Sequence, residues 1–448
     1  IFAKGANWIP PLSFLQYPQY SELERVHLTA AKEGHFNMLR VWGGGVYGSD
    51  SFYDFCDRNG ILVWQDFQFA QGVVPNDQGW KLNVSEEALD NVIRISGHPS
   101  LALWCGNNEM EGGYRAREGT MIHLGVKKDY MSFYLEIFER LFPDIVKLIQ
   151  PGISYWPASP SSGGNFKAHW STRKGDTHFW AIWKRVGKQN IREYAKHNSR
   201  FVSEFGHFAF PNLETLKEWI SADELNVNSP IFQNHDKQPG GINILAEKIF
   251  QQFGLDFFKL PIDVQVYLSQ LSQLDALGYA IAHWRLNSKT FRTMGILYWQ
   301  LNDCWPVLSW SSIDVIGRWK GFHYEVKRLY QPIAVIFEEM SKGFTLWVIN
   351  DTLRDTQIRI EYSIWGISRT GEVIQLKSSR ILLHSKPMVS KAIEKIKIKR
   401  KSQPRIPKEN VFIIFRYEYA DPNSGTLQKI NGTKFYSLPE EIISILTE

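Results

Sequence analysis

The chain has 448 residues, enough for two or three domains, and its 44% hydrophobic and 22% charged residues are typical of a globular protein. Its formal net charge of +5 is small for this length, so nothing indicates a nucleic-acid partner, and no apolar run is long enough to span a membrane. The three cysteines show neither a disulfide framework nor metal-ligand spacing, and the histidines show no such spacing either, so we expect no metal. The Gly43-Gly44-Gly45 turn matches neither a phosphate-binding loop nor a dinucleotide motif, so we also expect no cofactor.

Short apolar segments alternate with amphipathic helical segments up to about residue 303. The predicted strands are Gly5–Ile9, Asn37–Trp42, Ile61–Asp66, Leu101–Asn107, Ile153–Ala158, Asp176–Phe179, Phe201–Glu204 and Met294–Leu301. The predicted helices are Ser21–Glu33, Ser51–Arg58, Ser85–Ile95, Tyr130–Ile149, Val264–Ser288 and Trp319–Leu329. Eight strands with helices between them predict an α/β fold, a (β/α)8 TIM barrel over residues 1–331 with an insertion near 223–258.

The sequence pattern changes after Pro332, where β-branched residues become more frequent and turn residues recur at short spacing. This pattern predicts a small C-terminal immunoglobulin-like β-sandwich over residues 332–448. Its predicted strands are Thr345–Ile349, Gln357–Ile364, Ile381–Leu383 and Val411–Tyr417. The basic stretch Lys391–Lys401 alternates Ile and Lys, which favours an amphipathic strand with a charged outer face over a patch that binds polyanions.

Two glutamates at strand ends are the strongest functional signal. An apolar strand that begins at Leu101 ends in a polar cluster with Glu109, and a second strand ends at Glu204. In a barrel, both carboxylates would point into the C-terminal mouth, where active sites lie. Hydrolysis of a glycosidic bond needs an acid and a second carboxylate. A salt bridge would explain either glutamate alone, but the pair favours catalysis.

Four neighbouring residues could support such a pair. Asn108 carries a side-chain amide that could hold a sugar hydroxyl or the nucleophile, and Arg40, which ends the second predicted strand, could keep the nucleophile ionised. His178 and Tyr298, near the ends of the sixth and eighth strands, could supply hydrogen bonds. We expect Glu109 to be the carboxyl group whose pKa is raised, because a general acid must hold its proton.

Six motifs, in this order along the chain, resemble those of the β-mannosidases of glycoside hydrolase family 2. They are Gly5-Ala6-Asn7-Trp8-Ile9-Pro10, Arg40-Val41-Trp42-Gly43-Gly44-Gly45-Val46-Tyr47, Val63-Trp64-Gln65-Asp66-Phe67, Trp104-Cys105-Gly106-Asn107-Asn108-Glu109, Ser203-Glu204-Phe205-Gly206 and Leu297-Tyr298-Trp299-Gln300-Leu301-Asn302-Asp303. The Asn-Glu pair alone would resemble the larger clan of retaining glycosidases, whereas the whole set is specific to the β-mannosidases.

The resemblance implies an exo-acting retaining β-mannosidase that removes terminal, non-reducing β-D-mannose from oligosaccharides or glycoconjugates. Glu109 would be the acid/base, Glu204 the nucleophile, and Asn108 a contact to the sugar 2-hydroxyl. Trp42 and Trp299 would line the subsite for the mannose. Three further candidates for the rim of the site, or for the layer behind it, are Asp66, Gln65 and His178. Trp64 is expected in the barrel core.

Other interpretations stay open. The same chemistry could act on another sugar, as in a β-glucuronidase, a β-galactosidase or an exo-glucosaminidase, or the barrel could bind carbohydrate without catalysis. Members of the family normally carry two β-domains before the barrel, and this chain starts at Ile1 instead of Met, so we expect further sequence upstream. The Lys- and Ile-rich last third favours a bacterial cytoplasmic protein, whereas sequons at Asn83, Asn350 and Asn431 are compatible with a lysosomal or secreted one. The oligomeric state is open.

Overall fold

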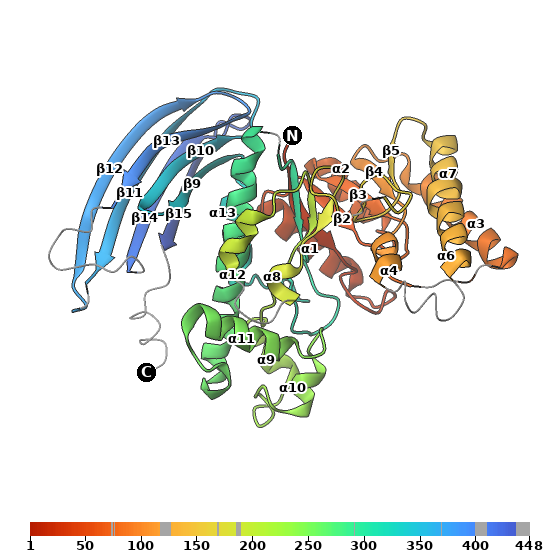
Figure 1. Cartoon of the computed structure of the whole chain (residues 1–448), viewed down its shortest axis with the longest axis horizontal. Coiled ribbons are helices and arrows are strands. Elements are labelled where there is room, and N and C mark those ends of the chain that lie inside the picture. The colour runs from red at the N-terminus through yellow and green to blue at the C-terminus, as the bar shows by residue number, and fades with distance from the viewer. Residues whose placement is uncertain are drawn as a thin grey trace.

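The computed structural model describes residues 1–72, 75, 77–116, 127–167, 170–184, 190–290, 292–368, 370–398 and 410–435. Figure 1 shows a parallel sheet with surrounding helices on one side of the molecule and an antiparallel sandwich on the other, with the long helix α12 between them. A group of shorter helices, α9 to α11, extends from the barrel below α12 in the same view.

Eight parallel strands form one curled sheet in the order β5-β4-β3-β2-β1-β8-β7-β6. They are β1 (Ala3–Trp8), β2 (Met38–Val41), β3 (Leu62–Asp66), β4 (Leu101–Cys105), β5 (Ser154–Trp156), β6 (Thr177–His178), β7 (Val202–Glu204) and β8 (Gly295–Tyr298). All eight predicted strands are present, so the prediction of a (β/α)8 barrel is confirmed. Among the described residues no backbone pairing joins β5 to β6, so the barrel sheet is open along that seam.

Helices follow the strands as predicted. The α-helices are α1 (Tyr20–Glu33), α2 (Asp50–Asn59), α3 (Gln78–Ile95), α4 (Met110–Ala116), α6 (Lys127–Glu136), α7 (Phe142–Ile149), α8 (Ala181–Lys184), α9 (Leu213–Trp219), α10 (Pro230–Asn234), α11 (Gly241–Phe253), α12 (Ile262–Asn287) and α13 (Gly321–Leu329). A π-helix, η1 (Ile137–Leu141), interrupts the long helix predicted at Tyr130–Ile149, and 3-10 turns lie at η2 (Ile191–Lys196), η3 (Phe257–Lys259) and η4 (Ser288–Thr290). Within the described part of the chain, none of the helices has the length and apolar character needed to cross a bilayer.

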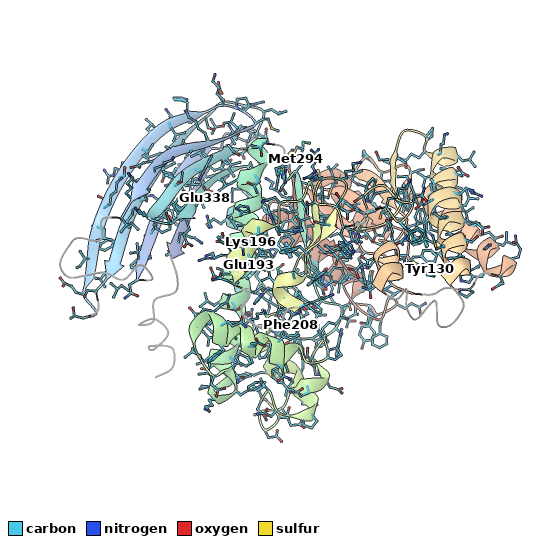
Figure 2. The ribbon with its side chains drawn as sticks, viewed as in Figure 1. Tyr130, Glu193, Lys196, Phe208, Met294 and Glu338 are labelled. Carbon is cyan, nitrogen blue, oxygen red and sulfur yellow. The ribbon has the colours of Figure 1, made fainter. Side chains whose placement is uncertain are left out.

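Sequence signals explain where these helices begin and end. The side chain of Ser49 accepts a hydrogen bond from the backbone N–H of Phe52 and starts α2, and Gly60 ends the helix in the left-handed conformation. The segment between β7 and α12 forms a separate small core around α9, α10 and α11. Phe208, labelled in Figure 2, belongs to this core. The predicted insertion near 223–258 therefore lies within a helical extension with an apolar interior of its own.

Side chains on the barrel strands alternate between the interior and the helical layer, as the period of two requires. The barrel interior holds a small cluster of Ala3, Met38, Trp64, Cys105 and Leu297. Trp64 was expected in the core, and its burial in this cluster confirms that interpretation. The alternation also fixes which residues at the strand ends can reach the mouth of the barrel.

The C-terminal part is a sandwich of two antiparallel sheets, with strand orders β13-β10-β9 and β12-β11-β14-β15. The strands are β9 (Ile333–Met340), β10 (Gly343–Asn350), β11 (Thr356–Ile367), β12 (Val373–Ser385), β13 (Val389–Lys397), β14 (Val411–Ala420) and β15 (Leu427–Phe435). The predicted sandwich is confirmed. The basic stretch Lys391–Lys401 forms most of β13, as expected for an amphipathic strand, and its last three residues lie outside the described part.

A charged cluster joins the sandwich to the barrel. The carboxylate of Asp351, just after β10, accepts hydrogen bonds from Lys4 Nζ in β1, at 3.1 Å, and from Arg285 Nη2 in α12. The Lys4 and Arg285 side chains are almost fully buried, whereas that of Asp351 is 22% exposed. Burial would raise the pKa of Asp351, but the charges of Arg285 and Lys4 outweigh it and hold the pKa below its usual 3.8.

Replacing Asp351 with asparagine should lower the free energy of unfolding at pH 7 by about 3 kcal/mol, because two buried cations lose their partner. The folded pKa of Asp351 lies below its unfolded value, so its stabilisation is present above about pH 3.8 and is lost as the pH falls through the folded pKa. Urea unfolding at pH 7 and pH 3 measures the effect. The exposed Asp355→Asn is the control; equal losses for both variants at pH 7 would contradict the role of the cluster.

Candidate active site

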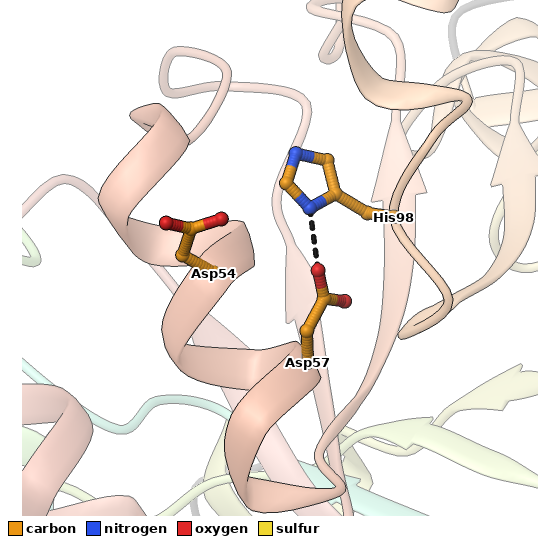
Figure 3. Close-up of side chains that lie close together, drawn as sticks. All are labelled: Asp54, Asp57 and His98. Carbon is orange, nitrogen blue, oxygen red and sulfur yellow. Dashed lines mark hydrogen bonds and ion pairs between the residues drawn. The ribbon is translucent and has the colours of Figure 1, made fainter.

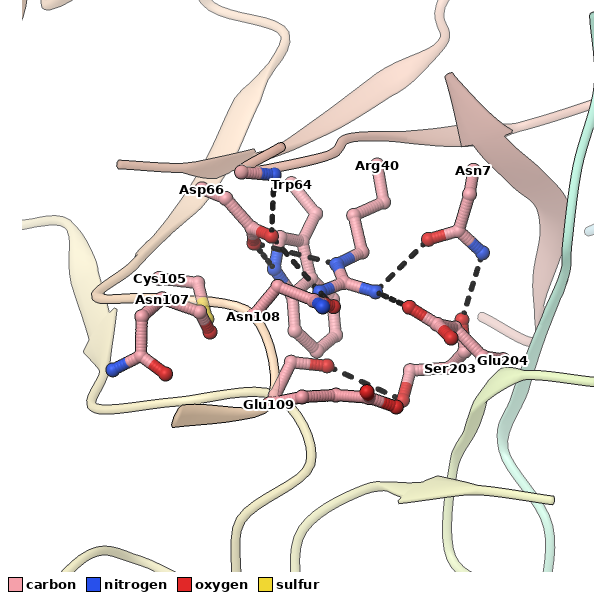
Figure 4. A network of polar contacts seen from close by, with 12 residues as sticks. Asn7, Arg40, Trp64, Asp66, Cys105, Asn107, Asn108, Glu109, Ser203 and Glu204 are labelled. Carbon is pink, nitrogen blue, oxygen red and sulfur yellow. Dashed lines mark hydrogen bonds and ion pairs between the residues drawn. The ribbon is translucent and has the colours of Figure 1, made fainter. Parts of the chain in front are cut away.

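Arg40 is the centre of the polar network at the mouth of the barrel (Figure 4). It lies one residue before the end of β2, is fully buried, and donates to carboxylates on both sides: Nη2 to Asp66 Oδ2 at 2.8 Å and Nη1 to Glu204 Oε1 at 2.8 Å. Nη1 also donates to Asn7 Oδ1 at 2.9 Å, Nη2 to Asn108 Oδ1 at 2.8 Å, and Nε to the second oxygen of Asp66 at 3.3 Å. One guanidinium group therefore fixes the side chains of β1, β3, β4 and β7 relative to one another.

Glu204, at the end of β7, is held by donors on both of its oxygens. Oε1 accepts from Arg40, and Oε2 accepts from Trp180 Nε1 at 3.2 Å. Its side chain is 5% exposed. Burial raises the pKa of Glu204 above its usual range, although the charges of His178 and Arg40 oppose that rise.

Glu109 follows β4 at the entry to α4. Its backbone φ of 56° lies in the left-handed region, which non-glycine residues seldom adopt, and its N–H donates to Ser159 O at 2.7 Å. The helix that follows begins with a cap, since Asn107 Oδ1 accepts from the N–H of Met110 at 3.1 Å. The side chain of Glu109 is 18% exposed, more than that of Glu204, so it is the more accessible of the two carboxylates.

The pKa of Glu109 differs from the expectation. Burial alone would raise it, but the hydrogen bond and charge of His178, together with Lys184 and Gln71, lower the pKa to about 2. The prediction of a raised pKa is therefore wrong. The reason is a partner 69 positions away in sequence, His178, whose Nδ1 lies 2.8 Å from Glu109 Oε1.

His178 lies between the two glutamates. Its Nδ1 is 2.8 Å from Glu109 Oε1 and 3.3 Å from Glu204 Oε2, and the three groups each place an atom within 4.8 Å of the others. The side chain is fully buried at the end of β6. The structure thus brings the two predicted glutamates and the predicted histidine into one cluster.

Asn108 and Asp66 both bind Arg40, but Asp66 lies deeper. The carboxylate of Asp66 has no exposed surface, since it also accepts from Gly43 N at 3.0 Å and Trp64 Nε1 at 2.9 Å. It therefore lies behind Arg40, in the layer behind the site and not at the rim, so Asp66 has no surface with which to contact a substrate. Gln65 is likewise buried behind the site, where its Oε1 accepts from the hydroxyl of Tyr53 at 2.6 Å.

Trp42 and Trp299 follow β2 and β8 and contact each other edge to face, with ring centroids 4.9 Å apart. Both are partly exposed, as a wall of the site requires. The turn after Trp42 needs glycine, because a Cβ on Gly44 would lie 2.0 Å from the Trp42 ring. The structure thus brings the two predicted subsite tryptophans together.

Tyr298 is not in the site. Its side chain has no exposed surface, its hydroxyl pairs with Ser312 Oγ at 2.6 Å, and its ring packs on Phe36 and Phe322 in the helical layer. Leu297 points into the barrel, so Tyr298 must point outward and Trp299 inward again. The prediction that Tyr298 contacts the reacting groups is wrong for this reason.

Three side chains of the site were absent from the predicted set: Asn7, Gln71 and Trp180. Asn7 accepts from Arg40 and donates from Nδ2 to Ser203 O at 2.9 Å, Gln71 Nε2 donates to Glu109 Oε2, and Trp180 Nε1 donates to Glu204 Oε2. Asn7 could have been found, because it is a polar residue near the end of the first strand, within a motif that carries the resemblance. Nothing local marks Gln71 or Trp180, which lie in loops.

Among the residues that the structure describes, two groups of side chains have ligand types that metals use. Asp54, Asp57 and His98 form one near the surface (Figure 3), where His98 Nδ1 lies 2.6 Å from Asp57 Oδ2 and the other Asp57 oxygen accepts from Ser100 N. These hydrogen bonds connect α2 to the turn before β4. The second group is the Glu109 cluster, where Arg40 already balances Glu204. Both groups are therefore explained by protein contacts.

A barrel sheet with two carboxylates at the ends of β4 and β7, close enough to share one imidazole, is the arrangement of a glycoside hydrolase catalytic domain. The sequence is 31% identical to the β-mannosidase of Capra hircus over 436 residues, which is 91% of this chain and 47% of that protein. It is also 31% identical to β-mannosidase B of Aspergillus fumigatus over 403 residues, which is 83% of this chain and 46% of that protein. No protein-family model matches the sequence.

The structure resembles that of the β-D-mannosidase from Dictyoglomus thermophilum, with a TM-score of 0.79 and 34% identity over 98% of this chain and 50% of the other. The exo-chitosanase CsxA of Amycolatopsis orientalis shares the fold, with a TM-score of 0.68 at 17% identity. The chain therefore belongs to the β-mannosidases of glycoside hydrolase family 2, and it spans about half the length of the curated relatives it matches.

Proposed function

We propose that this chain contains the catalytic machinery of an exo-acting β-mannosidase that hydrolyses terminal β-D-mannosides with retention of configuration. The observation that carries the proposal is the pair of carboxylates at the ends of β4 and β7, with atoms within 4.8 Å of each other around His178. Retaining glycosidases need carboxyl groups about 5–5.5 Å apart, whereas inverting enzymes need about 6.5–9.5 Å to admit a water. The short separation favours retention.

The surroundings of the two glutamates support different roles. Glu204 accepts from Arg40 and Trp180 and is 5% exposed, which suits a fixed nucleophile. Glu109 is more accessible, so it suits the group that exchanges protons with the leaving alcohol and with water. In this mechanism Glu204 attacks the anomeric carbon while Glu109 protonates the departing oxygen, and Glu109 then deprotonates the water that releases the sugar.

Asn108, Trp42 and Trp299 are proposed to contact the mannose. The Oδ1 of Asn108 is taken by Arg40, so its amide nitrogen is the group available to a sugar hydroxyl. The edge-to-face rings of Trp42 and Trp299 would form an apolar wall against the sugar.

The lowered pKa of Glu109 means that a proton must move onto this carboxylate before the first step of the reaction.

We further propose that residues 1–331 act as the catalytic domain and 332–448 as a C-terminal domain, with β-mannoside oligosaccharides or glycoconjugates as substrates.

The sequon at Asn350 is unsuited to glycosylation, because this side chain is fully buried and donates to Arg354 O and Ser385 O. Asn83 and Asn431 are exposed and remain compatible with a secreted or lysosomal history.

The proposal is tested with the full-length protein. We expect hydrolysis of 4-nitrophenyl β-D-mannoside to exceed that of the matched glucoside, galactoside, glucuronide and glucosaminide. 2-Deoxy-2-fluoro-β-D-mannosyl fluoride should inactivate the enzyme and add the mass of the fluoro-sugar to the peptide that contains Glu204, as mass spectrometry can detect. Preference for another sugar in the panel would overturn the substrate, and turnover that proceeds without any labelled peptide would overturn the covalent mechanism.

A further inference from the structure

Asp176, just before β6, is a buried carboxylate behind the site and accepts four hydrogen bonds. Its Oδ1 accepts from Trp156 Nε1 at 2.9 Å and from Ser161 N at 2.9 Å. Its Oδ2 lies 2.7 Å from Ser159 Oγ and 2.5 Å from Ser203 Oγ. Four donors use the acceptor positions of both oxygens, so Asp176 is an ionised carboxylate with no position left for a proton of its own.

Ser159 transmits this charge to His178. A hydroxyl has a single hydrogen, and two oxygens 2.7 Å apart repel each other unless a hydrogen lies between them. The hydrogen of Ser159 therefore points to Asp176, and at 2.5 Å the hydroxyl of Ser203 is committed in the same way. Ser159 Oγ can then only accept at its contact with His178 Nε2, 3.0 Å away, so Nε2 carries a hydrogen.

The other ring nitrogen also carries a hydrogen. His178 Nδ1 lies 2.8 Å from Glu109 Oε1, the shorter of its two carboxylate contacts, with Glu204 Oε2 at 3.3 Å. The surroundings hold the pKa of Glu109 low, and an ionised carboxylate can only accept, so the hydrogen lies on Nδ1. Two more charges act on these carboxylates: Arg40 pairs with Glu204, and Lys184 of α8 acts on Glu109. Both nitrogens of the imidazole thus face acceptors, which is the environment of an imidazolium ion.

We propose that Asp176, acting through Ser159, holds His178 as an imidazolium ion, and that His178 hands its Nδ1 proton to Glu109 when a glycoside binds. The proposal rests on the function proposed above, in which Glu109 must be protonated before the glycosidic bond breaks. Asp176 and Ser159 are positioning residues, because they act only through His178.

His178 regains over one turnover the proton that it gives up. The Nδ1 proton moves 2.8 Å to Glu109 Oε1, which leaves a neutral imidazole and a carboxylic acid. Glu109 then gives the proton to the glycosidic oxygen as its bond to the anomeric carbon breaks and the bond to Glu204 forms. In the second step water attacks the anomeric carbon, Glu204 leaves, and the water proton returns through Glu109 to His178.

The test uses leaving groups that differ in their need for a proton. Ser159→Ala should reduce kcat for methyl β-mannoside by about 10- to 100-fold, less than the loss of the acid/base itself would cost, and change kcat for 2,4-dinitrophenyl β-mannoside by less than about 3-fold. Ser159→Thr keeps the hydroxyl and should restore the rate for the methyl glycoside. In ¹⁵N NMR spectra, the His178 resonances, assigned with His178→Gln, should be those of imidazolium in the native protein and of a neutral ring in Ser159→Ala.

Asp176→Asn should give the same pattern of rates. The matched control is Asp303→Asn, because Asp303 is also buried and accepts two serine hydroxyls, at 2.6 Å each, but these belong to Ser309 and Ser311, whereas His178 is bonded to Ser159. Equal slowing of both leaving groups, or of neither, in Ser159→Ala and Asp176→Asn would overturn the relay. Labelling by the activated fluoro-mannoside needs no acid, so its failure in the native protein would instead reject the proposed function. If Asp176→Asn fails to fold, Ser159→Ala and its threonine rescue still decide the question.

Discussion

Glu204→Ala is expected to lower kcat/KM for 4-nitrophenyl β-mannoside by more than about 10⁴-fold, because the reaction loses the atom that attacks the anomeric carbon. The fold should survive, since Arg40 keeps its bonds to Asp66, Asn7 and Asn108. The exposed Glu214→Ala on α9 is the control for a glutamate removed elsewhere.

Rescue of Glu204→Ala by azide gives a more specific test of the nucleophile. Truncation of the Glu204 side chain to a methyl group would leave a space into which a small anion fits, on the face of the sugar opposite to the leaving group. Added azide should therefore restore turnover of an activated mannoside and yield the α-mannosyl azide, which NMR identifies by its anomeric signals. Undiminished turnover in Glu204→Ala, or a β-configured azide product, would contradict the assignment of the nucleophile.

Glu109→Ala should have the second largest effect, a loss of about 10²- to 10⁴-fold in kcat for methyl β-mannoside, because this alkoxide leaves only with a proton. The first step with 2,4-dinitrophenyl β-mannoside needs no proton, so we expect a rapid burst of dinitrophenol followed by slow release of the sugar. Azide should speed the second step and yield the β-mannosyl azide, since it attacks the covalent intermediate from the face that water uses.

The two variants together test which carboxylate has which role. If Glu109→Ala gives the α-azide and Glu204→Ala the β-azide, the roles are reversed. Such a reversal would agree with the two pKa shifts, since the pKa of Glu109 is lowered to about 2 and that of Glu204 is raised. The configuration of the azide product therefore shows which glutamate is the nucleophile and which is the acid/base during turnover, whatever their protonation before the substrate binds.

The sequence predicted the barrel and its two glutamates because both depend on local patterns. A buried strand that ends in a polar residue can be recognised without knowledge of its neighbours, and parallel strands place such ends at one edge. The same reasoning failed for Tyr298. The run Ile296–Trp299 is apolar throughout, so nothing in it shows which residues face the barrel and which face the helices. Packing on Phe36 and Phe322 decides this, and both are distant in sequence.

Charge states were harder to predict than positions. The pKa of Glu109 depends on His178, 69 positions away, and the state of His178 depends on Ser159 and Asp176. Each link is a hydrogen bond between loops or strand ends whose relative placement only the closed fold defines. Asn7 shows an intermediate case, because its strand-end position was visible in sequence but its bond to Arg40 was not.

The open seam between β5 and β6 has a consequence for how this scaffold can vary. In the described part of the chain no strand ladder crosses it, and Asp176 bridges it with side-chain bonds to Trp156 and Ser159. Lengthening or shortening the connecting segment would break no ladder, whereas the same change between paired strands would shift their register. The seam is therefore the part of the barrel wall where the loop can change in length without a shift of strand register, provided that Ser159 and Asp176 keep their places.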